Sequence, residues 1–245
     1  MPNVRVLIPA RFQSSRFPGK PLSKISGKTM IQRVFENCAL SGFDTYVVTD
    51  DQRIEEHVVE FGGKVIRVDD DVPSGTERIA LAAARTFDGE EDLIINVQGD
   101  EPLLKADYIK KIAQVHLESS FEIMTMVKRR SSSHEFYKNP NVVKALFIEE
   151  QNKCLYFSRA SIPFDRDGQG CDWFHHIGVY SYRPKALQDF AKTTVSQLEN
   201  IEKLEQLRAM ELGMQIGAIE VDFEPLGVDT PEDIKRVEEV ICGNE

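Results

Sequence analysis

The stretch that decides the fold is Leu93-Ile94-Ile95-Asn96-Val97, a nearly continuous apolar run that predicts a β-strand. An unbroken apolar strand is typical of a sheet covered on both faces, whereas half-exposed strands alternate apolar and polar residues. The run leads into Gln98-Gly99-Asp100-Glu101-Pro102, whose Gly, Asp and Pro predict that the strand ends there. We therefore expect a buried sheet with a polar loop at the exit of this strand.

The chain before this strand alternates between strand and helix patterns. Val4–Ile8 predicts a first strand, and apolar residues at helical spacing follow from residue 30 to residue 39. Further strands are expected at 46–48 and 64–68, and further helices at 54–61 and 78–87. Alternation of this kind over about the first 115 residues predicts an α/β fold with a mainly parallel, doubly wound sheet.

The second half of the chain is less regular. A β-hairpin is expected from strands at 142–148 and 153–158 around Glu149-Glu150-Gln151-Asn152. The remaining expected elements are strands at 177–182 and 215–221 and helices at 201–212 and 231–240. Because no tandem repeat, low-complexity tract or linker interrupts the sequence, we expect one domain over residues 1–245 with a β-hairpin insertion.

Composition limits the partners. The 245 residues include 30 Lys and Arg against 40 Asp and Glu, a net charge of −10, and a nucleic-acid partner is not expected because that affinity depends on many basic residues. No apolar run approaches the roughly 20 residues that cross a bilayer, and the first residues lack a signal peptide's features. We expect a cytoplasmic protein with no membrane partner. The four cysteines lie far apart without a C-x-x-C pair, so reduced thiols are expected.

A basic loop follows the first expected strand. Pro9–Pro21 carries Arg11, Arg16 and Lys20, and ligands of open α/β sheets bind beyond the carboxyl ends of the strands. Arg11 and Lys20 can balance the charge of a polyphosphate, and Gly19 permits close approach of the backbone. The glycine spacings of the P-loop and of the Rossmann fingerprint are both absent, and a solvated basic loop is the alternative interpretation.

Two carboxylates are candidates for a metal site. Asp100 follows the strand at 93–97 and should face the same rim as the basic loop. A carboxylate beside bound phosphates is repelled unless a cation lies between them, which points to Mg²⁺. Asp229 is the second candidate, since Thr230 and Asp233 are explained as the start of a helix and Asp229 is left over. A simple turn at Asp100 and a simple helix start at Asp229 are the alternatives.

Two further clusters can recognise a sugar. Arg159 ends one expected strand and can pair with a carboxylate through two hydrogen bonds, while His176 begins another and can bond a hydroxyl group. His175 and His176 should point to opposite faces of the strand, which argues against a shared metal site. A structural role for either histidine is the alternative, as is a solvated face for the charge-rich segment 199–208.

Taken in order, these motifs closely resemble the CMP-Kdo synthetases, the 3-deoxy-manno-octulosonate cytidylyltransferases of lipopolysaccharide synthesis. The resemblance runs essentially from end to end. The first motif recurs across sugar nucleotidyltransferases, whereas seven motifs in the same order are highly specific. They are Pro9-Ala10-Arg11 with Ser14, Arg16, Pro18, Gly19 and Lys20; Ser74–Arg78; Asn96–Pro102; Leu155–Ala160; His176–Tyr180; Leu204–Arg208; and Val228–Asp233.

The resemblance implies a Rossmann-like nucleotide-diphospho-sugar transferase fold with a mainly parallel mixed sheet. It implies a homodimer that converts CTP and Kdo (3-deoxy-D-manno-octulosonate) to CMP-Kdo and pyrophosphate, with a sugar-binding and dimerisation subregion around 135–215. The implied catalytic residues are Lys20, Asp100 and Asp229, of which the two aspartates would bind Mg²⁺. The implied nucleotide-binding residues are Ala10, Arg11, Ser14, Lys20, Ser74 and Gly75, and the implied sugar-binding residues are Arg78, Gln98, Arg159, His176, Tyr180, Glu202 and Gln206.

Two departures from the family pattern flank the implied sugar pocket. His175 stands where the family often has Arg, and Val72-Pro73 replaces a more usual polar pair before Ser74. They leave the sugar open, and the 8-amino-3,8-dideoxy analogue of Kdo is a second substrate to consider. Two other functional classes are a nucleotide-sugar glycosyltransferase, which would release a nucleoside diphosphate, and a non-catalytic regulator, which would bind CTP without turnover.

Overall fold

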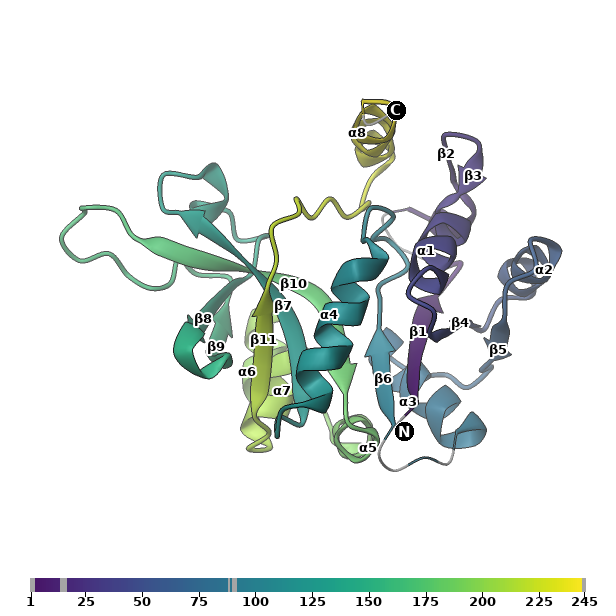
Figure 1. The fold of residues 1–245 in the computed structure, drawn as a ribbon, viewed down its shortest axis with the longest axis horizontal. Coiled ribbons are helices and arrows are strands. Elements are labelled where there is room, and N and C mark those ends of the chain that lie inside the picture. The colour runs from purple at the N-terminus through teal and green to yellow at the C-terminus, as the bar shows by residue number, and fades with distance from the viewer. Residues whose placement is uncertain (1–2, 14–16, 88, 90–91, 244–245) are drawn as a thin grey trace. The chain divides into compact units, whose positions relative to one another are not determined.

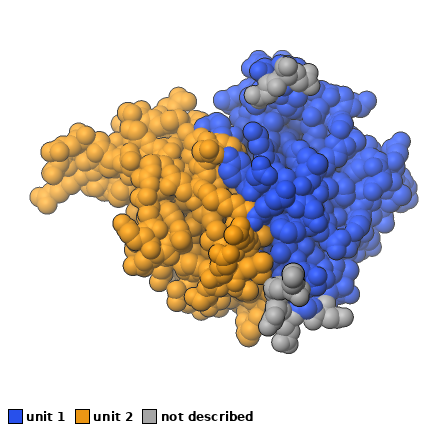
Figure 2. Space-filling view, in the orientation of Figure 1, with its two compact units in different colours: residues 1–110, 224–245 blue, residues 111–223 orange. Residues whose placement is uncertain are grey.

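The computed structural model describes residues 3–13, 17–87, 89 and 92–243, and the chain divides into two compact units. Unit 1 comprises residues 1–110 and 224–245, and unit 2 comprises residues 111–223 (Figure 2). The boundary falls within helix α4 (Ala106–Leu117). Each unit contains its own set of paired strands (Figure 1).

Unit 1 is built on four parallel strands in the order β5-β4-β1-β6. In that order they are β5 (Val65–Arg67), β4 (Asp44–Thr49), β1 (Val4–Ala10) and β6 (Leu93–Asn96). All of β6 is buried, as are residues 6–10 of β1, which is the burial expected when both faces of a sheet are covered. The predicted parallel α/β arrangement is confirmed for this part of the chain.

The helices of unit 1 alternate with its strands (Figure 1). Helix α3 (Gly75–Thr86) begins earlier than the expected residue 78. The reason is a capping box, in which Ser74 Oγ accepts from the N–H of Glu77 at 3.2 Å and the Glu77 carboxylate accepts from the N–H of Ser74 at 3.0 Å. The other helices of unit 1 are α1 (Met30–Ala39), α2 (Gln52–Glu60) and α8 (Pro231–Cys242), together with the start of α4.

The sequence predicted a loop between β1 and α1, but the structure has regular elements in this segment. It contains the short 3-10 helix η1 (Lys20–Leu22) and a hairpin of β2 (Lys24–Ile25) and β3 (Lys28–Thr29). Ile25 is fully buried in a cluster with Met30, Val228 and Val237. This apolar contact packs the start of α1 and the helix α8 against the loop.

Unit 2 contains five strands in the order β10-β7-β11-β9-β8, and β10 also pairs with β8, so the pairings form a closed ring. In the same order they are β10 (Asp172–Tyr182), β7 (Ile123–Ser131), β11 (Ile216–Glu220), β9 (Lys153–Ser158) and β8 (Lys144–Ile148). The predicted hairpin is confirmed. Its turn is the 3-10 helix η3 (Glu149–Gln151) followed by Asn152 in the left-handed region. Unit 2 also contains η2 (Glu135–Lys138) and α5 (Pro184–Lys192).

Two expectations for unit 2 were wrong. The expected helix at 201–212 is two helices, α6 (Gln197–Glu202) and α7 (Gln206–Glu211), because Lys203 adopts a left-handed conformation with φ 53°. In the charge-rich segment 199–208, Glu199 and Arg208 form a buried ion pair, so these two side chains do not belong to a solvated face. Strand β10 starts at residue 172 instead of 177, so both adjacent histidines lie within it.

No helix in the described ranges is both long enough and apolar enough to cross a bilayer. All four cysteines are described, and each is a free thiol.

Candidate active site

The end of β1 is the point where the predicted nucleotide-binding segments meet. A Cβ added at Gly75 would lie 3.2 Å from the Pro9 side chain, and one added at Gly99 would lie 3.0 Å from the Pro9 carbonyl oxygen. The start of α3 and the exit of β6 therefore both approach β1 more closely than a larger residue allows. This brings Ala10 and Gly75 together with the loop that carries Asp100.

Lys20 lies between the two predicted metal-binding carboxylates. Its ammonium group donates to Asp100 Oδ2 at 2.7 Å and to the Val228 carbonyl oxygen at 2.8 Å, and it lies 3.8 Å from Asp229 Oδ1. Gly19 precedes it with φ 74°, and its N–H donates to the carbonyl of Phe12 at 2.9 Å. This left-handed turn, which favours glycine, directs Lys20 toward the exit of β6.

The Asp229 backbone is held on both sides. The N–H of Val228 donates to the carbonyl of Asp100 at 3.0 Å. The Asp233 carboxylate accepts from the N–H groups of Asp229 at 3.0 Å and Thr230 at 2.9 Å. The predicted helix start is thus confirmed, and it also fixes the backbone of the residue that precedes it.

Glu101 adds a third carboxyl group, for which the sequence pattern predicted no role. Burial, and then the neighbouring Asp100 carboxylate, raise the pKa of Glu101 to about 8, with Asp229 adding to the rise and Lys20 opposing it. The adjacency of two acids after an apolar strand was the available signal. At pH 7 the Glu101 carboxyl group is therefore mostly protonated, and the negative charge beside Lys20 comes from Asp100 and Asp229.

This donor set fits Mg²⁺. The position of the Lys20 ammonium shows that Asp100 and Asp229 converge on one cation, and carboxylate oxygens are the ligands that Mg²⁺ prefers. The described residues contain no group of three or more His, Cys, Asp or Glu side chains arranged for a metal. Mg²⁺ is ordinarily held by one or two carboxylates together with substrate phosphates, so two aspartates suffice.

Arg11 links the basic loop to the segment before α3. Its guanidinium donates to the carbonyls of Val72 at 2.9 Å and Pro73 at 3.2 Å, while its buried Nε has no hydrogen-bond partner among the described residues. Ser74 and Gly75 follow directly, at the N-terminus of α3. Backbone N–H groups at such a helix start can bind phosphate oxygens. Ser14, also predicted here, lies outside the described residues.

Two predicted sugar-binding residues lie in unit 1. Arg78 is 2% exposed, and its guanidinium bonds the carbonyl of Val68 at 2.5 Å and pairs with Asp50 at 2.7 Å. Burial lowers the pKa of this guanidinium. Arg78 therefore contacts Asp50, the residue that follows β4 in the same unit. Gln98 is half-buried at the exit of β6.

The other predicted sugar-binding residues lie in unit 2, where His176 forms an aromatic group with its neighbours. Its ring lies 4.9 Å from Phe157 and 5.4 Å from Tyr180, measured between centroids. Burial, and then the nearby His175, lower the pKa of His176 to about 3. The imidazole is therefore neutral at any physiological pH.

Arg159 and Glu202 form a second group in unit 2. The Glu202 carboxylate accepts from Ser158 Oγ at 2.6 Å and from the N–H of Arg159 at 2.9 Å, and Arg159 Nε donates back to the Glu202 carbonyl at 2.7 Å. Phe157, which touches His176, immediately precedes Ser158 in β9. Gln206 is 7% exposed, and its Nε2 has no hydrogen-bond partner within the described ranges.

Asn96 is a polar residue for which the sequence pattern predicted no role. It is fully buried at the end of β6, and neither its amide nitrogen nor its amide oxygen has a partner in the described part of the chain. Leaving such atoms unpaired costs about 1–3 kcal/mol, so a ligand or water should bond them. One amide within an apolar strand was the only sequence signal.

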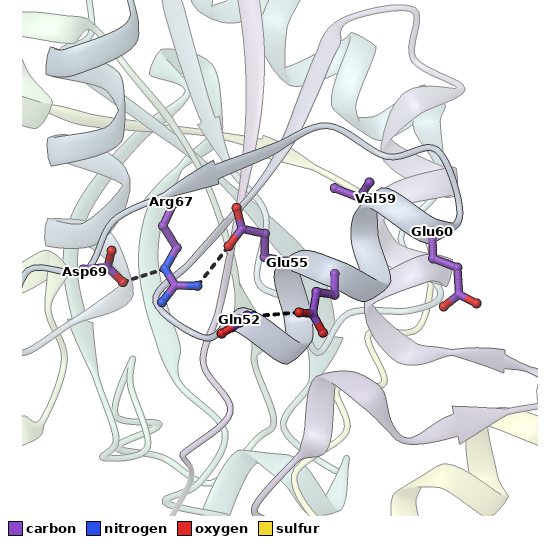
Figure 3. A pocket seen from close by; sticks show the side chains of 7 residues that line it. Gln52, Glu55, Val59, Glu60, Arg67 and Asp69 are labelled. Atoms are coloured by element: carbon purple, nitrogen blue, oxygen red, sulfur yellow. Dashed lines mark hydrogen bonds and ion pairs between the residues drawn. The ribbon is translucent and has the colours of Figure 1, made fainter.

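A pocket between α2 and β5 contains none of the predicted site residues (Figure 3). It is lined by Glu55, Glu56, Glu60 and Asp69 together with Arg67. Arg67 is already paired with Glu55 at 2.9 Å and with Asp69 at 2.5 Å. The remaining excess of negative charge makes this pocket unsuitable for a polyphosphate.

Comparison with known proteins identifies the family. The sequence matches the cytidylyltransferase family over residues 5–216, which is most of the chain. The chain belongs to the cytidylyltransferase family.

Individual relatives of this cytidylyltransferase cover it almost completely. It is 43% identical to the 3-deoxy-manno-octulosonate cytidylyltransferase of Francisella tularensis subsp. novicida, over 97% of this chain and 98% of the relative. It is 45% identical to the 8-amino-3,8-dideoxy-manno-octulosonate cytidylyltransferase of Shewanella halifaxensis, over 96% and 97% of the two chains. A solved structure of CMP:2-keto-3-deoxy-manno-octonic acid synthetase in complex with CTP has 34% identity and a TM-score of 0.92, over 99% of this chain and 100% of that one.

These comparisons confirm the resemblance seen in the sequence. The fold is the Rossmann-like α/β fold of nucleotide transferases, and the protein is a nucleotidyltransferase by family.

Proposed function

We propose that this cytidylyltransferase couples CTP to Kdo, giving CMP-Kdo and pyrophosphate for lipopolysaccharide synthesis. The observation that carries the proposal is the Lys20 ammonium bonded to Asp100, with Asp229 3.8 Å away, at the exit of a parallel sheet. The Francisella relative named for this sugar supports the choice of substrate. The solved relative that carries CTP supports the choice of nucleotide.

The reaction proposed is an in-line displacement at the α-phosphorus of CTP by the anomeric hydroxyl of the sugar acid. Both reactants are anions, so the site must lower their mutual repulsion. Asp100 and Asp229 would hold Mg²⁺, which when bound would supply Lewis-acid stabilisation of the phosphate charge and lower the pKa of the attacking hydroxyl group. Arg11 and Lys20 stabilise the charge that grows on the leaving pyrophosphate. The proton of the hydroxyl group passes to solvent as the bond from the α-phosphorus to pyrophosphate breaks, so positioning and electrostatics are sufficient without a covalent intermediate or a protein general base.

Nucleotide and sugar contacts are part of the same proposal. The CTP phosphates would meet Arg11, Lys20 and the N-terminus of α3 at Ser74 and Gly75, with Ala10 and Ser14 on the preceding loop. The proposed sugar-binding residues are Arg78 and Gln98 in unit 1, and Arg159, His176, Tyr180, Glu202 and Gln206 in unit 2. The family match extends over both compact units, which supports treating residues 1–245 as one functional domain.

A second acceptor is 8-amino-3,8-dideoxy-manno-octulosonate. The Shewanella relative named for this sugar is 45% identical, and the Francisella relative is 43% identical. Relatives named for either sugar thus match this chain about equally, so both sugars are acceptors to compare.

Pyrophosphate release tests the proposal. The full chain is incubated with CTP and Mg²⁺, and Kdo, its 8-amino analogue and a sialic acid are compared as acceptors. We expect rapid release with one of the first two sugars and little with sialic acid. Binding of CTP without turnover, or release of a nucleoside diphosphate from a nucleotide sugar, would replace the proposal with a regulator or a glycosyltransferase.

We propose further that the enzyme acts in the cytoplasm as a homodimer, with dimer contacts in the subregion around 135–215. The family resemblance supports this assembly. Sedimentation at micromolar concentration tests it, and a monomer that turns over at the full rate would exclude a functional dimer.

A further inference from the structure

Thr125 lies opposite an irregularity in the strand that carries His176. The pairing of β10 with β7 shifts register between Ile177 and Ser181. Thr125 is fully buried on β7. Its Oγ1 lies 2.9 Å from the carbonyl oxygen of Val179, 3.1 Å from that of Ile177, and 3.1 Å from His176 Nε2.

Counting protons at this hydroxyl group fixes the direction of each hydrogen bond. A threonine hydroxyl has one proton and two lone pairs, whereas a carbonyl oxygen can only accept. The proton of Thr125 is therefore directed to the carbonyls of Ile177 and Val179. The hydroxyl then presents a lone pair to the ring, so His176 Nε2 must carry the hydrogen and donate it.

The other ring nitrogen is consequently a bare acceptor. Because burial keeps the imidazole neutral, only one nitrogen carries a proton, and Nδ1 has a free lone pair. No hydrogen bond of Nδ1 occurs within the described residues. The rings of Phe157 and Tyr180, with centroids 4.9 and 5.4 Å away, restrict rotation of the imidazole.

We propose that Thr125 is a positioning residue that fixes His176 in the Nε2–H form, so that Nδ1 accepts a hydrogen bond from an O–H or N–H donor of the sugar acid. This inference rests on the proposed function, since it assigns the substrate group that faces His176. The ionised carboxylate of the sugar cannot occupy that position, because two acceptors would oppose each other. The carboxylate must instead face a cationic donor.

Imidazole nitrogen NMR tests the first half without any turnover. The full chain labelled with ¹⁵N is compared at pH 7 with its T125S and T125V variants, and the His176 signals are assigned with H176Q. In the unsubstituted protein and in T125S we expect the His176 proton on Nε2 alone. In T125V the proton should no longer be confined to Nε2. A protonated Nδ1 in the unsubstituted protein would overturn the proposal, even if T125V fails to fold.

Steady-state kinetics test the second half. We expect T125V to raise KM for the sugar acid about tenfold, the scale of one buried hydrogen bond, while KM for CTP stays within twofold. T125S should have both KM values of the unsubstituted protein. Thr45→Val is the matched control, because Thr45 is also a buried strand residue whose hydroxyl donates to a backbone carbonyl, that of Phe43 at 3.1 Å. Equal changes in both KM values, or an equal effect of Thr45→Val, would indicate a merely structural role. Absence of turnover in the unsubstituted protein would refute the proposed function and leave the NMR result to decide the role of Thr125.

Discussion

At the scale of single residues, the candidate site depends on opposite charges held at short range. Lys20, Asp100 and Asp229 come from three distant parts of the sequence, and the backbone around each is fixed by hydrogen bonds. Side chains fixed in this way need little reorganisation when substrate binds, which is the condition for effective electrostatic stabilisation.

Replacing Asp100 tests the metal assignment. Asp100→Asn removes the negative charge at nearly constant size, and we expect turnover to fall about 10²- to 10³-fold with the thermal melting unchanged. Asp107→Asn, at an exposed residue of α4, should keep full activity. If Asp100→Asn folds normally and retains near-normal turnover that depends on Mg²⁺, the metal lies elsewhere.

Replacing Lys20 tests the phosphate assignment. Lys20→Ala removes a charged donor, worth about 1.5–3 kcal/mol, so kcat/KM for CTP should fall roughly 10- to 100-fold. Lys28→Ala is the control, because Lys28 is an exposed lysine paired with Glu36. Unchanged CTP kinetics in the Lys20 variant would move the phosphate subsite to other residues.

At the scale of elements, strand exits and helix starts bring the nucleotide-binding segments together. The ends of β1 and β6 and the start of α3 approach one another at Pro9, which is possible because two of the contacts are made by glycine.

The approach at Gly99 leads to a stability prediction. A Cβ there would lie 3.0 Å from the Pro9 carbonyl oxygen, and backbone atoms cannot give way cheaply, so Gly99→Ala should lower the free energy of unfolding by about 1–3 kcal/mol. Gly227→Ala is the control, since its Cβ would meet Glu101 at an ordinary 3.4 Å. Denaturant unfolding measures both, and equal stabilities would mean that the β6 exit shifts freely.

A buried histidine at the end of α4 makes stability depend on pH. His116 is fully buried, with Nδ1 2.7 Å from Ser181 Oγ and Nε2 3.0 Å from the Phe121 carbonyl oxygen. Burial lowers its pKa from the ordinary 6.5 to about 4. Folding therefore favours the neutral ring, and this contribution is complete above pH 6.5 and lost as the pH falls toward 4.

The expected loss is up to about 3 kcal/mol between these pH values. His116→Gln cannot titrate, so its stability should change less over this range when unfolding is followed by denaturant titration at several pH values. His57→Gln, on α2 in unit 1, should keep the acid sensitivity of the unsubstituted protein. Identical pH profiles for all three proteins would contradict the assignment.

At the scale of the whole molecule, metal and nucleotide should have different effects on stability. The cores of both units are formed by apolar side chains, and the described residues provide no metal site of three or more ligands. We expect EDTA to abolish pyrophosphate release while leaving the melting temperature unchanged. With Mg²⁺ restored, CTP at 100 times its Kd should stabilise the fold by about 2.7 kcal/mol. A large fall in melting temperature with EDTA alone would instead indicate a structural metal.

Sequence periodicity determined the parallel sheet of unit 1 and the β8–β9 hairpin, because buried strands and tight turns leave local patterns. It also identified Lys20, Asp100 and Asp229 as charged residues beside strand exits and a helix start. It failed at 201–212, where the left-handed Lys203 divides the expected helix into two. It also failed for Glu199 and Arg208, whose sequence pattern is that of an exposed charged face although the two side chains form a buried pair. Such a pair depends on contacts that local pattern does not contain.

Only the tertiary structure decided that Lys20 and the Asp100 and Asp229 carboxylates meet, since residues far apart in sequence are joined by packing around Ile25 and Val228. It also decided which donors are already engaged, such as the two terminal nitrogens of Arg78, and which atoms lack a partner among the described residues, such as the amide of Asn96. The physical reason is that residue types and their spacing specify which groups can interact, whereas hydrogen-bond partners depend on distances set by the folded chain.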